Sequence, residues 1–167
     1  TVTTTDGDIQ VDGVLNADST GSAANIALTT QDGAPATQRD IIVNNDILAE
    51  DDVTLDASND IQIAAAANVT ADATAVVAPG SGTLTLTADN DIIQQAGAGN
   101  ITGAAVNPTA GGNVILADVE TDGMTVAAGE AVDITANTDG ARTLTITSNN
   151  ASGDARITNN GDLGNTG

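Results

Sequence analysis

The side chains best placed to do chemistry in this sequence are aspartates that recur at one point of a repeat. One aspartate stands directly before each of four short aliphatic segments: Asp8, Asp40, Asp60 and Asp91. In a chain whose repeats stack, these four carboxylates form a column. A carboxylate in such a turn accepts hydrogen bonds from nearby backbone amides, as in an Asx turn. We expect this role at all four positions.

Bridging Ca²⁺ is the alternative for the same column. Unit charges about 5 Å apart in water repel each other by roughly 1 kcal/mol, and carboxylate oxygens are ligands that Ca²⁺ prefers. The sequence contains no copy of the calcium-binding repeat GGxGxDxUx, which disfavours that alternative. The prediction is therefore no cofactor and no metal site, with Ca²⁺ kept as a hypothesis.

Paired carboxylates raise a second possibility, because some enzymes cleave sugars with two acidic side chains. The pairs are Asp51 with Asp52 and Asp89 with Asp91. Sugar subsites typically use aromatic platforms and lyases need a basic partner, but the chain has no aromatic residue. Its only cations are the scattered Arg39, Arg142 and Arg156. We predict solvated acidic turns, no catalytic residues and no enzyme.

The overall composition excludes further classes. The 167 residues carry 23 acidic side chains and a net charge of −20, and they include no His, Cys, Trp, Tyr or Phe. The usual general bases and covalent nucleophiles are therefore missing. A nucleic-acid partner would need clustered cations and stacking aromatics, so none is expected. No apolar stretch is long enough to predict membrane insertion.

Residues 40–59, DIIVNNDILAEDDVTLDASN, show how these positions are held. Their aliphatic residues follow spacings of two, four, two, four and two: Ile41, Val43, Ile47, Ala49, Val53 and Leu55. A spacing of two places both side chains of a pair on one face of a strand, and NND and EDD are turn sequences. The next cycle begins at Ile61, so one coil of three short strands takes about 20 residues.

The same rhythm continues in both directions with insertions. We assign Ile9, Val11, Leu15, Ala17, Ile26 and Leu28 to the coil before it, and Ile61, Ile63, Val69, Ala71, Leu84 and Leu86 to the coil after it. Ile92, Ile101, Val114 and Leu116 are predicted to form another coil, followed by Met124, Val126, Val132, Ile134, Leu144 and Ile146, and then by Ala155, Ile157 and Leu163. The third-strand pairs would then recur every thirty residues, at Leu84, Val114 and Leu144.

This pattern predicts an all-β fold, a right-handed parallel β-helix (β-solenoid) with insertions before the third strand of the coil. The insertions would be DSTGSAAN (18–25), AVVAPGSG (75–82) and VNPTAGG (106–112), and these loops are the expected partner contacts. Residues 1–167 would form a single β-helical segment of five to six coils, a rod about 25 Å long.

Outward threonines in this rod suggest a further hypothesis. The sequences TLTLT and TLTIT present Thr83, Thr85, Thr87, Thr143, Thr145 and Thr147 on a strand surface. Flat ranks of threonine can organise water, as on an ice-binding face. We expect the equivalent outward positions elsewhere to include Asp56, Ile115, Ala117 and Asp133, which would interrupt the ranks. Threonine is also an ordinary residue on strand surfaces, and this interpretation is preferred.

Several repeated phrases resemble a known family. GDIQVDGVLNAD, RDIIVNNDILAEDDVTLDASNDIQI, GTLTLTADNDII and EAVDITANTDG each join an alternating strand to a Gly, Asn or Asp turn. In this they are similar to the repeats of filamentous-haemagglutinin-like exoproteins, which are exported by two-partner secretion. The resemblance implies a right-handed β-helical shaft on the outside of a Gram-negative cell, serving adhesion, biofilm formation or contact-dependent competition.

The expected function follows from the fold and the resemblance together. We predict a structural shaft segment of a large secreted cell-surface adhesin or extracellular fibre, cut from a longer repetitive chain, that projects or spaces other modules. The alternative is a self-assembling filament subunit or a cation-binding or ice-binding surface. Expected partners are neighbouring segments of the same parent chain or other copies stacked end to end, and the expected location is extracellular or on the bacterial outer surface.

Overall fold

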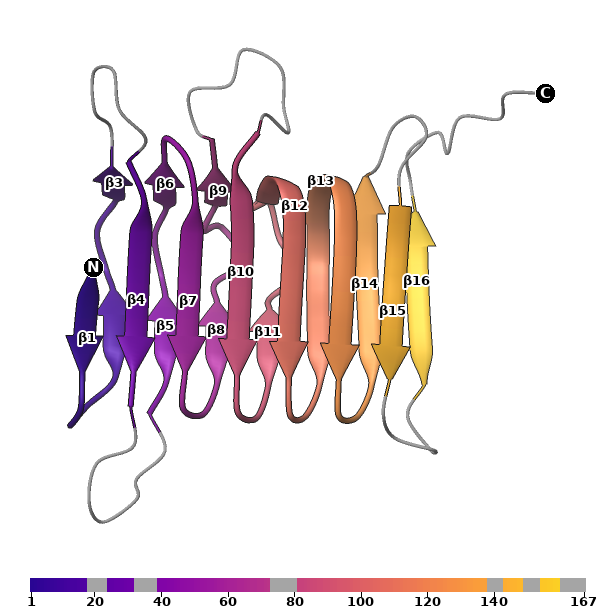
Figure 1. The fold of residues 1–167 in the computed structure, drawn as a ribbon, viewed down its shortest axis with the longest axis horizontal. Coiled ribbons are helices and arrows are strands. Elements are labelled where there is room, and N and C mark those ends of the chain that lie inside the picture. Colours follow the sequence, from indigo (N-terminus) through magenta and orange to yellow (C-terminus); the bar gives the residue numbers. More distant parts are fainter. Residues whose placement is uncertain (18–23, 32–38, 73–80, 138–142, 149–153, 160–167) are drawn as a thin grey trace.

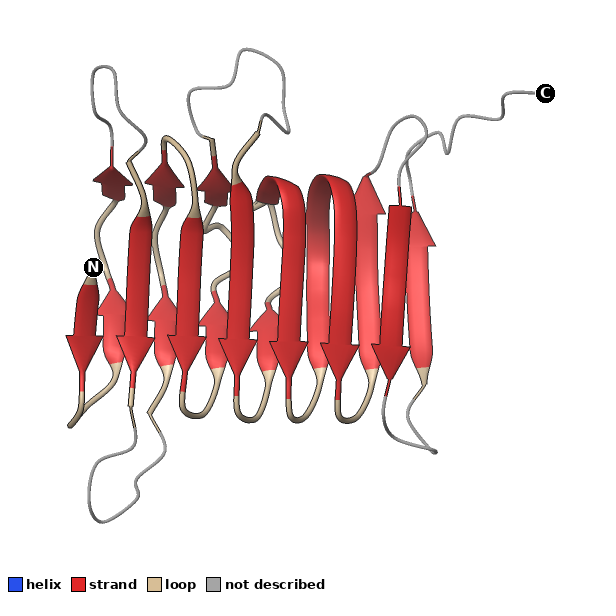
Figure 2. Ribbon diagram, in the orientation of Figure 1, coloured by secondary structure: helices blue, strands red, loops and turns tan. Residues whose placement is uncertain are grey.

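The structure is a computed structural model that describes residues 1–17, 24–31, 39–72, 81–137, 143–148 and 154–159. Every regular element in these ranges is a β-strand, as Figure 2 shows. None of the described residues belongs to a helix that could cross a membrane.

The sixteen strands are as follows: β1 (Val2–Thr4), β2 (Ile9–Val11), β3 (Leu15–Ala17), β4 (Ile26–Thr30), β5 (Ile41–Val43), β6 (Ile47–Ala49), β7 (Val53–Ala57), β8 (Ile61–Ile63), β9 (Val69–Ala71), β10 (Thr83–Ala88), β11 (Ile92–Gln94), β12 (Ile101–Ala110), β13 (Val114–Ala128), β14 (Val132–Asn137), β15 (Thr143–Ser148) and β16 (Ala155–Asn159).

These strands form three columns in which every strand pairs in parallel with its counterpart one coil further on. The first-strand column contains β2, β5, β8, β11, the start of β13, β14 and β16. The second-strand column contains β3, β6, β9, the start of β12, the middle of β13 and the end of β14. The third-strand column contains β1, β4, β7, β10, the end of β12, the end of β13 and β15.

The coil is right-handed, as predicted. In Figure 1 the near strands β4, β7 and β10 run downward and the more distant β5, β8 and β11 run upward, while the chain advances from left to right. The coil varies from 18 residues, between Val114 and Val132, to 32 residues, between Ile9 and Ile41. The fold is therefore the predicted parallel β-helix, with coils of unequal length.

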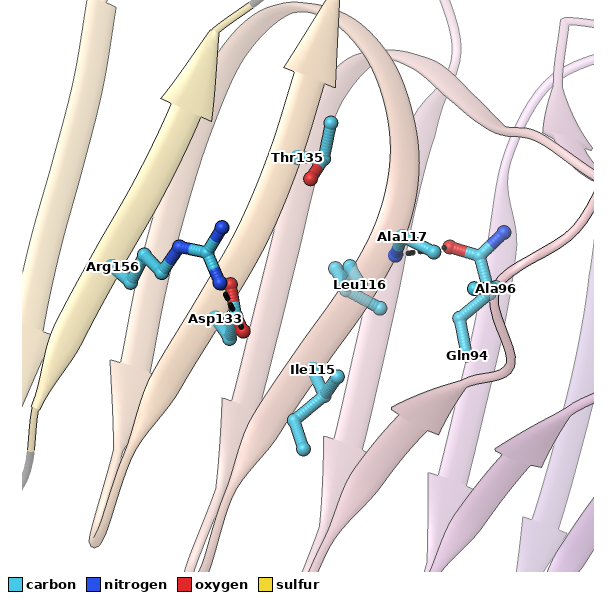
Figure 3. Close-up of a pocket in the computed structure, with 8 residues that line it drawn as sticks. All are labelled: Gln94, Ala96, Ile115, Leu116, Ala117, Asp133, Thr135 and Arg156. Carbon is cyan, nitrogen blue, oxygen red and sulfur yellow. Dashed lines mark hydrogen bonds and ion pairs between the residues drawn. The ribbon is translucent and has the colours of Figure 1, made fainter.

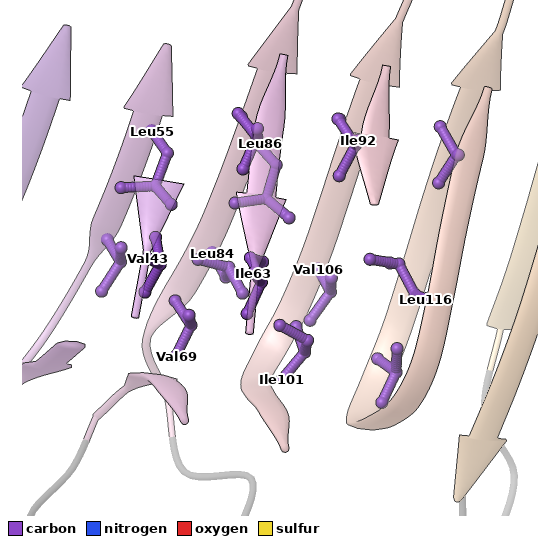
Figure 4. Packing of buried hydrophobic residues seen from close by; sticks show 14 of the residues in the cluster. Val43, Leu55, Ile63, Val69, Leu84, Leu86, Ile92, Ile101, Val106 and Leu116 are labelled. Carbon is purple, nitrogen blue, oxygen red and sulfur yellow. The ribbon is translucent and has the colours of Figure 1, made fainter. Parts of the chain in front are cut away.

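The core is the narrow interior of this rod, which Figure 4 shows in part. Inward residues alternate with outward ones along each strand, and the inward ones are aliphatic. The six aliphatic residues predicted within 40–59 are all fully buried: Ile41, Val43, Ile47, Ala49, Val53 and Leu55. Because side chains of equivalent positions stack on one another, branched aliphatics fill the interior at high density, and a large ring would separate the coils.

The assignment of the third strand after β10 was wrong. Leu84 pairs with Val106 rather than with Val114, and Val106 pairs with Met124, which pairs with Leu144. Val114 instead lies in the first-strand column, opposite Ile92. The spacing of thirty residues between Leu84, Val114 and Leu144 is a coincidence, because Val114 lies in a different column from Leu84 and Leu144.

The segment VNPTAGG is likewise not an insertion. Val106 and Ala110 are buried within β12, which continues from the second-strand column into the third without a break. Val106 pairs with Met124 and Thr109 pairs with Ala127, but the pairing of β12 with β13 is interrupted between them. Pro108 lies in this interruption and has no backbone N–H to donate. The other two predicted insertions, 18–25 and 75–82, lie largely outside the described residues, but each directly precedes a strand of the third-strand column, β4 and β10. Leu163 and Arg142 also lie outside the described residues.

The register predicts how the core responds to truncation. Leu55→Ala removes a fully buried side chain stacked between Leu28 and Leu86, and we expect it to lower the free energy of unfolding by about 3 kcal/mol. The matched control is Leu48→Ala, since Leu48 points outward from β6 and is half-buried. This substitution should lower the free energy of unfolding by only about 1 kcal/mol. Urea denaturation followed by circular dichroism measures both, and equal losses would contradict the assigned register.

Candidate functional site

The four predicted aspartates do form one column, and the structure shows what their side chains do. The backbone N–H of Asp40 donates to Asp8 Oδ1 at 3.0 Å. In the same way the N–H of Asp60 donates to Asp40 Oδ1 at 3.2 Å, and the N–H of Asp91 donates to Asp60 Oδ1 at 3.0 Å. Asn113 and Ala131 continue the series, with N–H···Oδ1 distances of 2.7 and 3.2 Å. We call this series the first-strand ladder.

The ladder corrects one detail of the Asx-turn prediction. Each side chain accepts from a backbone amide, as expected, but the amide belongs to the next coil rather than to its own turn. The carbonyl of the same ladder residue accepts the N–H of the strand one coil earlier, for example Ile41 N–H to Asp60 O at 2.9 Å. From Asp40 onward, the backbone N–H and C=O of each ladder residue are thus both satisfied where the chain turns, which a buried or half-buried backbone requires.

Similar ladders precede the other two columns, and sequence reasoning missed them. Before the second strand, the N–H of Asn68 donates to Asp46 Oδ1 at 2.8 Å and the N–H of Asn100 donates to Asn68 Oδ1 at 3.0 Å. Before the third strand, Asp52 N–H donates to Asn25 Oδ1 at 3.0 Å and Thr83 N–H donates to Asp52 Oδ1 at 2.8 Å. The signal was available, because each of the acceptors Asp46, Asn68, Asn25 and Asp52 stands one residue before a strand.

Gln94 is a second polar residue that the sequence did not single out. It occupies the inward position that Ile63 holds one coil earlier, and it is 2% exposed. Its Oε1 accepts the N–H groups of Ala117 and Asp118 at 3.0 and 3.2 Å, and its Nε2 donates to the carbonyl of Gly99 at 2.8 Å. The pairing of β11 with β13 ends after Ile93, and the Gln94 side-chain amide there takes the place of backbone hydrogen bonds between the two strands.

A shallow groove lies beside this amide on the first-strand face, as Figure 3 shows. It has a volume of about 290 Å³ and is lined by Gln94, Ala96, Ile115, Leu116, Ala117, Asp133, Thr135 and Arg156. Arg156 forms an exposed ion pair with Asp133 at 3.6 Å. Because Gln94 is already engaged with backbone groups, the groove offers a ligand little beyond a solvated ion pair.

One member of each carboxylate pair considered for sugar chemistry is built into a ladder. Asp52 belongs to the third-strand ladder and Asp91 to the first-strand ladder, and neither lines the groove of Figure 3. Among the described arginines, Arg39 pairs with Asp6 at 3.0 Å and Arg156 pairs with Asp133. Asp52 and Asp91 thus act as structural acceptors, and the two described arginines pair with aspartates outside both carboxylate pairs.

Three of the four residues predicted to interrupt the outward threonine ranks lie elsewhere. Ile115 and Asp133 belong to the first-strand column, where Ile115 faces Ile93 and Asp133, and Ala117 follows in the same segment of β13. They therefore cannot interrupt ranks that run along the third-strand column. Of the four predicted interruptions only Asp56 lies there, opposite Thr87.

The expectation of no metal site, with bridging Ca²⁺ as the alternative hypothesis, stays a prediction. Among the residues that the structure describes, no group of three or more acidic side chains is arranged to hold a metal ion. The Oδ1 atoms of Asp8, Asp40, Asp60 and Asp91 each accept a backbone N–H, so one oxygen of each carboxylate already has a partner.

The chain matches no protein-family model, no curated protein and no solved structure. Its resemblance to filamentous-haemagglutinin-like repeats therefore remains an interpretation of the repeated phrases.

The first-strand ladder makes a direct prediction about Asp60, whose Oδ1 accepts from Asp91 N–H and from Asn90 Nδ2 at 3.0 and 2.9 Å. Asp60→Ala leaves both donors without this acceptor and should lower the free energy of unfolding by about 1.5 kcal/mol. Asp60→Asn keeps an acceptor oxygen, as Asn113 does naturally, and should recover most of that stability. Urea denaturation compares the two variants, and an equal loss in both would show that the charge matters rather than the acceptor.

Because amides occupy the ladder oxygens, we expect divalent cations to add little stability. Adding EDTA at constant ionic strength should leave the thermal midpoint of the chain unchanged. Adding CaCl₂ should raise the midpoint no more than NaCl of equal ionic strength, since general screening of the −20 net charge accounts for the effect. A fall of the midpoint in EDTA that CaCl₂ reverses would instead establish bridging Ca²⁺.

Proposed function

We propose that this chain is a structural shaft segment of a large secreted cell-surface adhesin or extracellular fibre, and that it projects or spaces other modules. One observation carries the proposal: all three strand columns continue in register from coil to coil, from β2 through to β16 in the first-strand column. A rod of this kind transmits a fixed distance and direction between whatever precedes it and whatever follows it.

The chemistry of the rod supports a mechanical role. Its interior is aliphatic, its strand starts are held by Asp and Asn ladders between coils, and its outer surface carries most of the 23 acidic side chains. The ladders resist separation of neighbouring coils, because each coil is bonded to the next by side chains as well as by backbone. The net charge of −20 keeps such rods soluble and apart from one another at low salt.

The first coil supports the proposed partners. No described strand lies before β2 and β3 in their columns, and Val2 and Val14 are 51% and 58% exposed there. A groove of about 330 Å³ at this face is lined mainly by aliphatic residues, including Ile9, Val11 and Leu28. This surface suits a further coil of the same construction, supplied by a neighbouring segment of a longer chain or by another copy stacked end to end.

The family resemblance supplies the proposed location. Repeats of the filamentous-haemagglutinin type imply export and display outside a Gram-negative cell, and a stable fold without cysteine is compatible with that setting.

A distance measurement between attached modules tests the shaft. We expect a chimera with a folded reporter domain at each end of residues 1–167 to give one narrow inter-reporter distance, by small-angle scattering and by fluorescence transfer. The reason is that six pairing steps, from β2 to β16 in the first-strand column, set the length of the rod at about 4.8 Å each. A Gly-Ser linker of equal residue number is the control and should give a broad distribution.

The proposal fails if the shaft chimera gives a distribution as broad as that of the Gly-Ser linker. End-to-end assembly is distinguished in the same experiment, because it makes the scattering mass grow with protein concentration while the distance within each chimera stays fixed.

A further inference from the structure

We propose that the outward face of the third-strand column is an ice-binding surface, a role that goes beyond that of a spacer. The corrected register carries this inference. It places nine threonines in two adjacent ranks on one sheet, where the sequence alone suggested interrupted patches.

The two ranks are defined by the outward positions of successive strands in the third-strand column. Rank one consists of Ala27, Thr54, Thr85, Asn107, Thr125 and Thr145. Rank two consists of Thr3, Thr29, Asp56, Thr87, Thr109, Ala127 and Thr147. Threonine therefore fills four of six and five of seven positions, and the remaining four are small or short polar residues.

The geometry of this face is a regular grid. Neighbouring strands repeat at about 4.8 Å, and threonines two residues apart on a strand are separated by about 6.7 Å. The strands β4, β7 and β10 run nearly parallel in Figure 1, so the face has little twist. A grid with two perpendicular spacings of this size is comparable to the lattice of oxygen atoms on a prism face of ice.

Threonine suits such a contact chemically. Its hydroxyl can take a place in a water lattice, and its γ-methyl group fills the space between lattice waters. Its χ1 angle is stiff because the side chain is β-branched, so little conformational entropy is lost when water orders against it. Thr109, Thr125, Thr145 and Thr147 are exposed, and Thr54, Thr85 and Thr87 are partly exposed at the sheet surface.

Other ligand classes fit this face less well. Asp56 is the only charged residue in the two ranks, although the chain has 23 acidic residues, so the face lacks the charge that would attract an ion or a charged protein. The chain has no aromatic side chain on which a sugar ring could stack. The first-strand face makes a natural contrast, because its outward positions include Gln10, Ile42, Gln62, Ile115 and Arg156 rather than a threonine rank.

The test measures thermal hysteresis and the capture of fluorescently labelled full chain by a growing ice hemisphere. We expect the unaltered chain to shape ice crystals and to enter the ice. Thr87→Lys with Thr109→Lys places two bulky, strongly hydrated cations on paired positions of rank two and should lose most of both activities. The matched control, Gln10→Lys with Gln62→Lys, adds the same charge to exposed positions on the first-strand face and should keep both.

A third variant, Asp56→Thr, removes the single charge in rank two and should increase thermal hysteresis. Because it replaces an outward residue, it also decides the question if the lysine pair fails to fold by circular dichroism. The proposal is overturned if the unaltered chain shows neither hysteresis nor ice capture. It is equally overturned if the control loses as much as the rank-two pair, if Asp56→Thr brings no gain, or if sedimentation shows that the threonine face is covered by a second copy.

Discussion

The whole structure depends on one constraint: a single coil of three short strands cannot bury its own inward side chains. Each coil has to lie directly over another, so that Leu28, Leu55 and Leu86 stack and the strands that carry them pair in parallel. Burial of aliphatic surface drives the stacking, and backbone hydrogen bonds between coils fix its register. Stability is therefore distributed along the rod rather than gathered in one centre.

The same constraint explains which residues stand at the turns. A strand that begins at a corner of the coil leaves a backbone N–H that no strand carbonyl reaches, and an Asp or Asn side chain from the preceding coil accepts it. Close stacking also requires glycine at one corner, because a Cβ at Gly129 would collide with the carbonyl of Gly111, and one at Gly111 with the carbonyl of Asp89. The recurrence of Asp, Asn and Gly at these positions thus follows from the repeated corners.

How far the sequence predicted this arrangement depended on the turns. Where Asn and Asp triplets separate the strands, as in residues 40–59, all six residues predicted to point inward are buried, and only Ala57 at the end of β7 was not foreseen. The prediction failed at β12 and β13, because β12 passes one corner and β13 passes two without such triplets, and because Pro108 with Gly111 suggested a loop. The first-strand aspartates were identified, but their bonds to the next coil were not, since a single sequence does not show which coil lies above which. Gln94 was missed because its role depends on a local break in pairing between β11 and β13.

The central claim is the in-register stacking of coils, and a cysteine pair tests it most directly because the chain has no cysteine of its own. In the variant Thr85→Cys with Asn107→Cys, the two thiols lie on adjacent strands of the third-strand column, with Cα atoms about 4.8 Å apart. In Thr85→Cys with Ile115→Cys they lie on different faces of the rod. The account predicts that a short bifunctional thiol reagent joins the first pair rapidly in folded monomers and leaves the second pair unjoined. Efficient joining of residues 85 and 115, with none between 85 and 107, would contradict it.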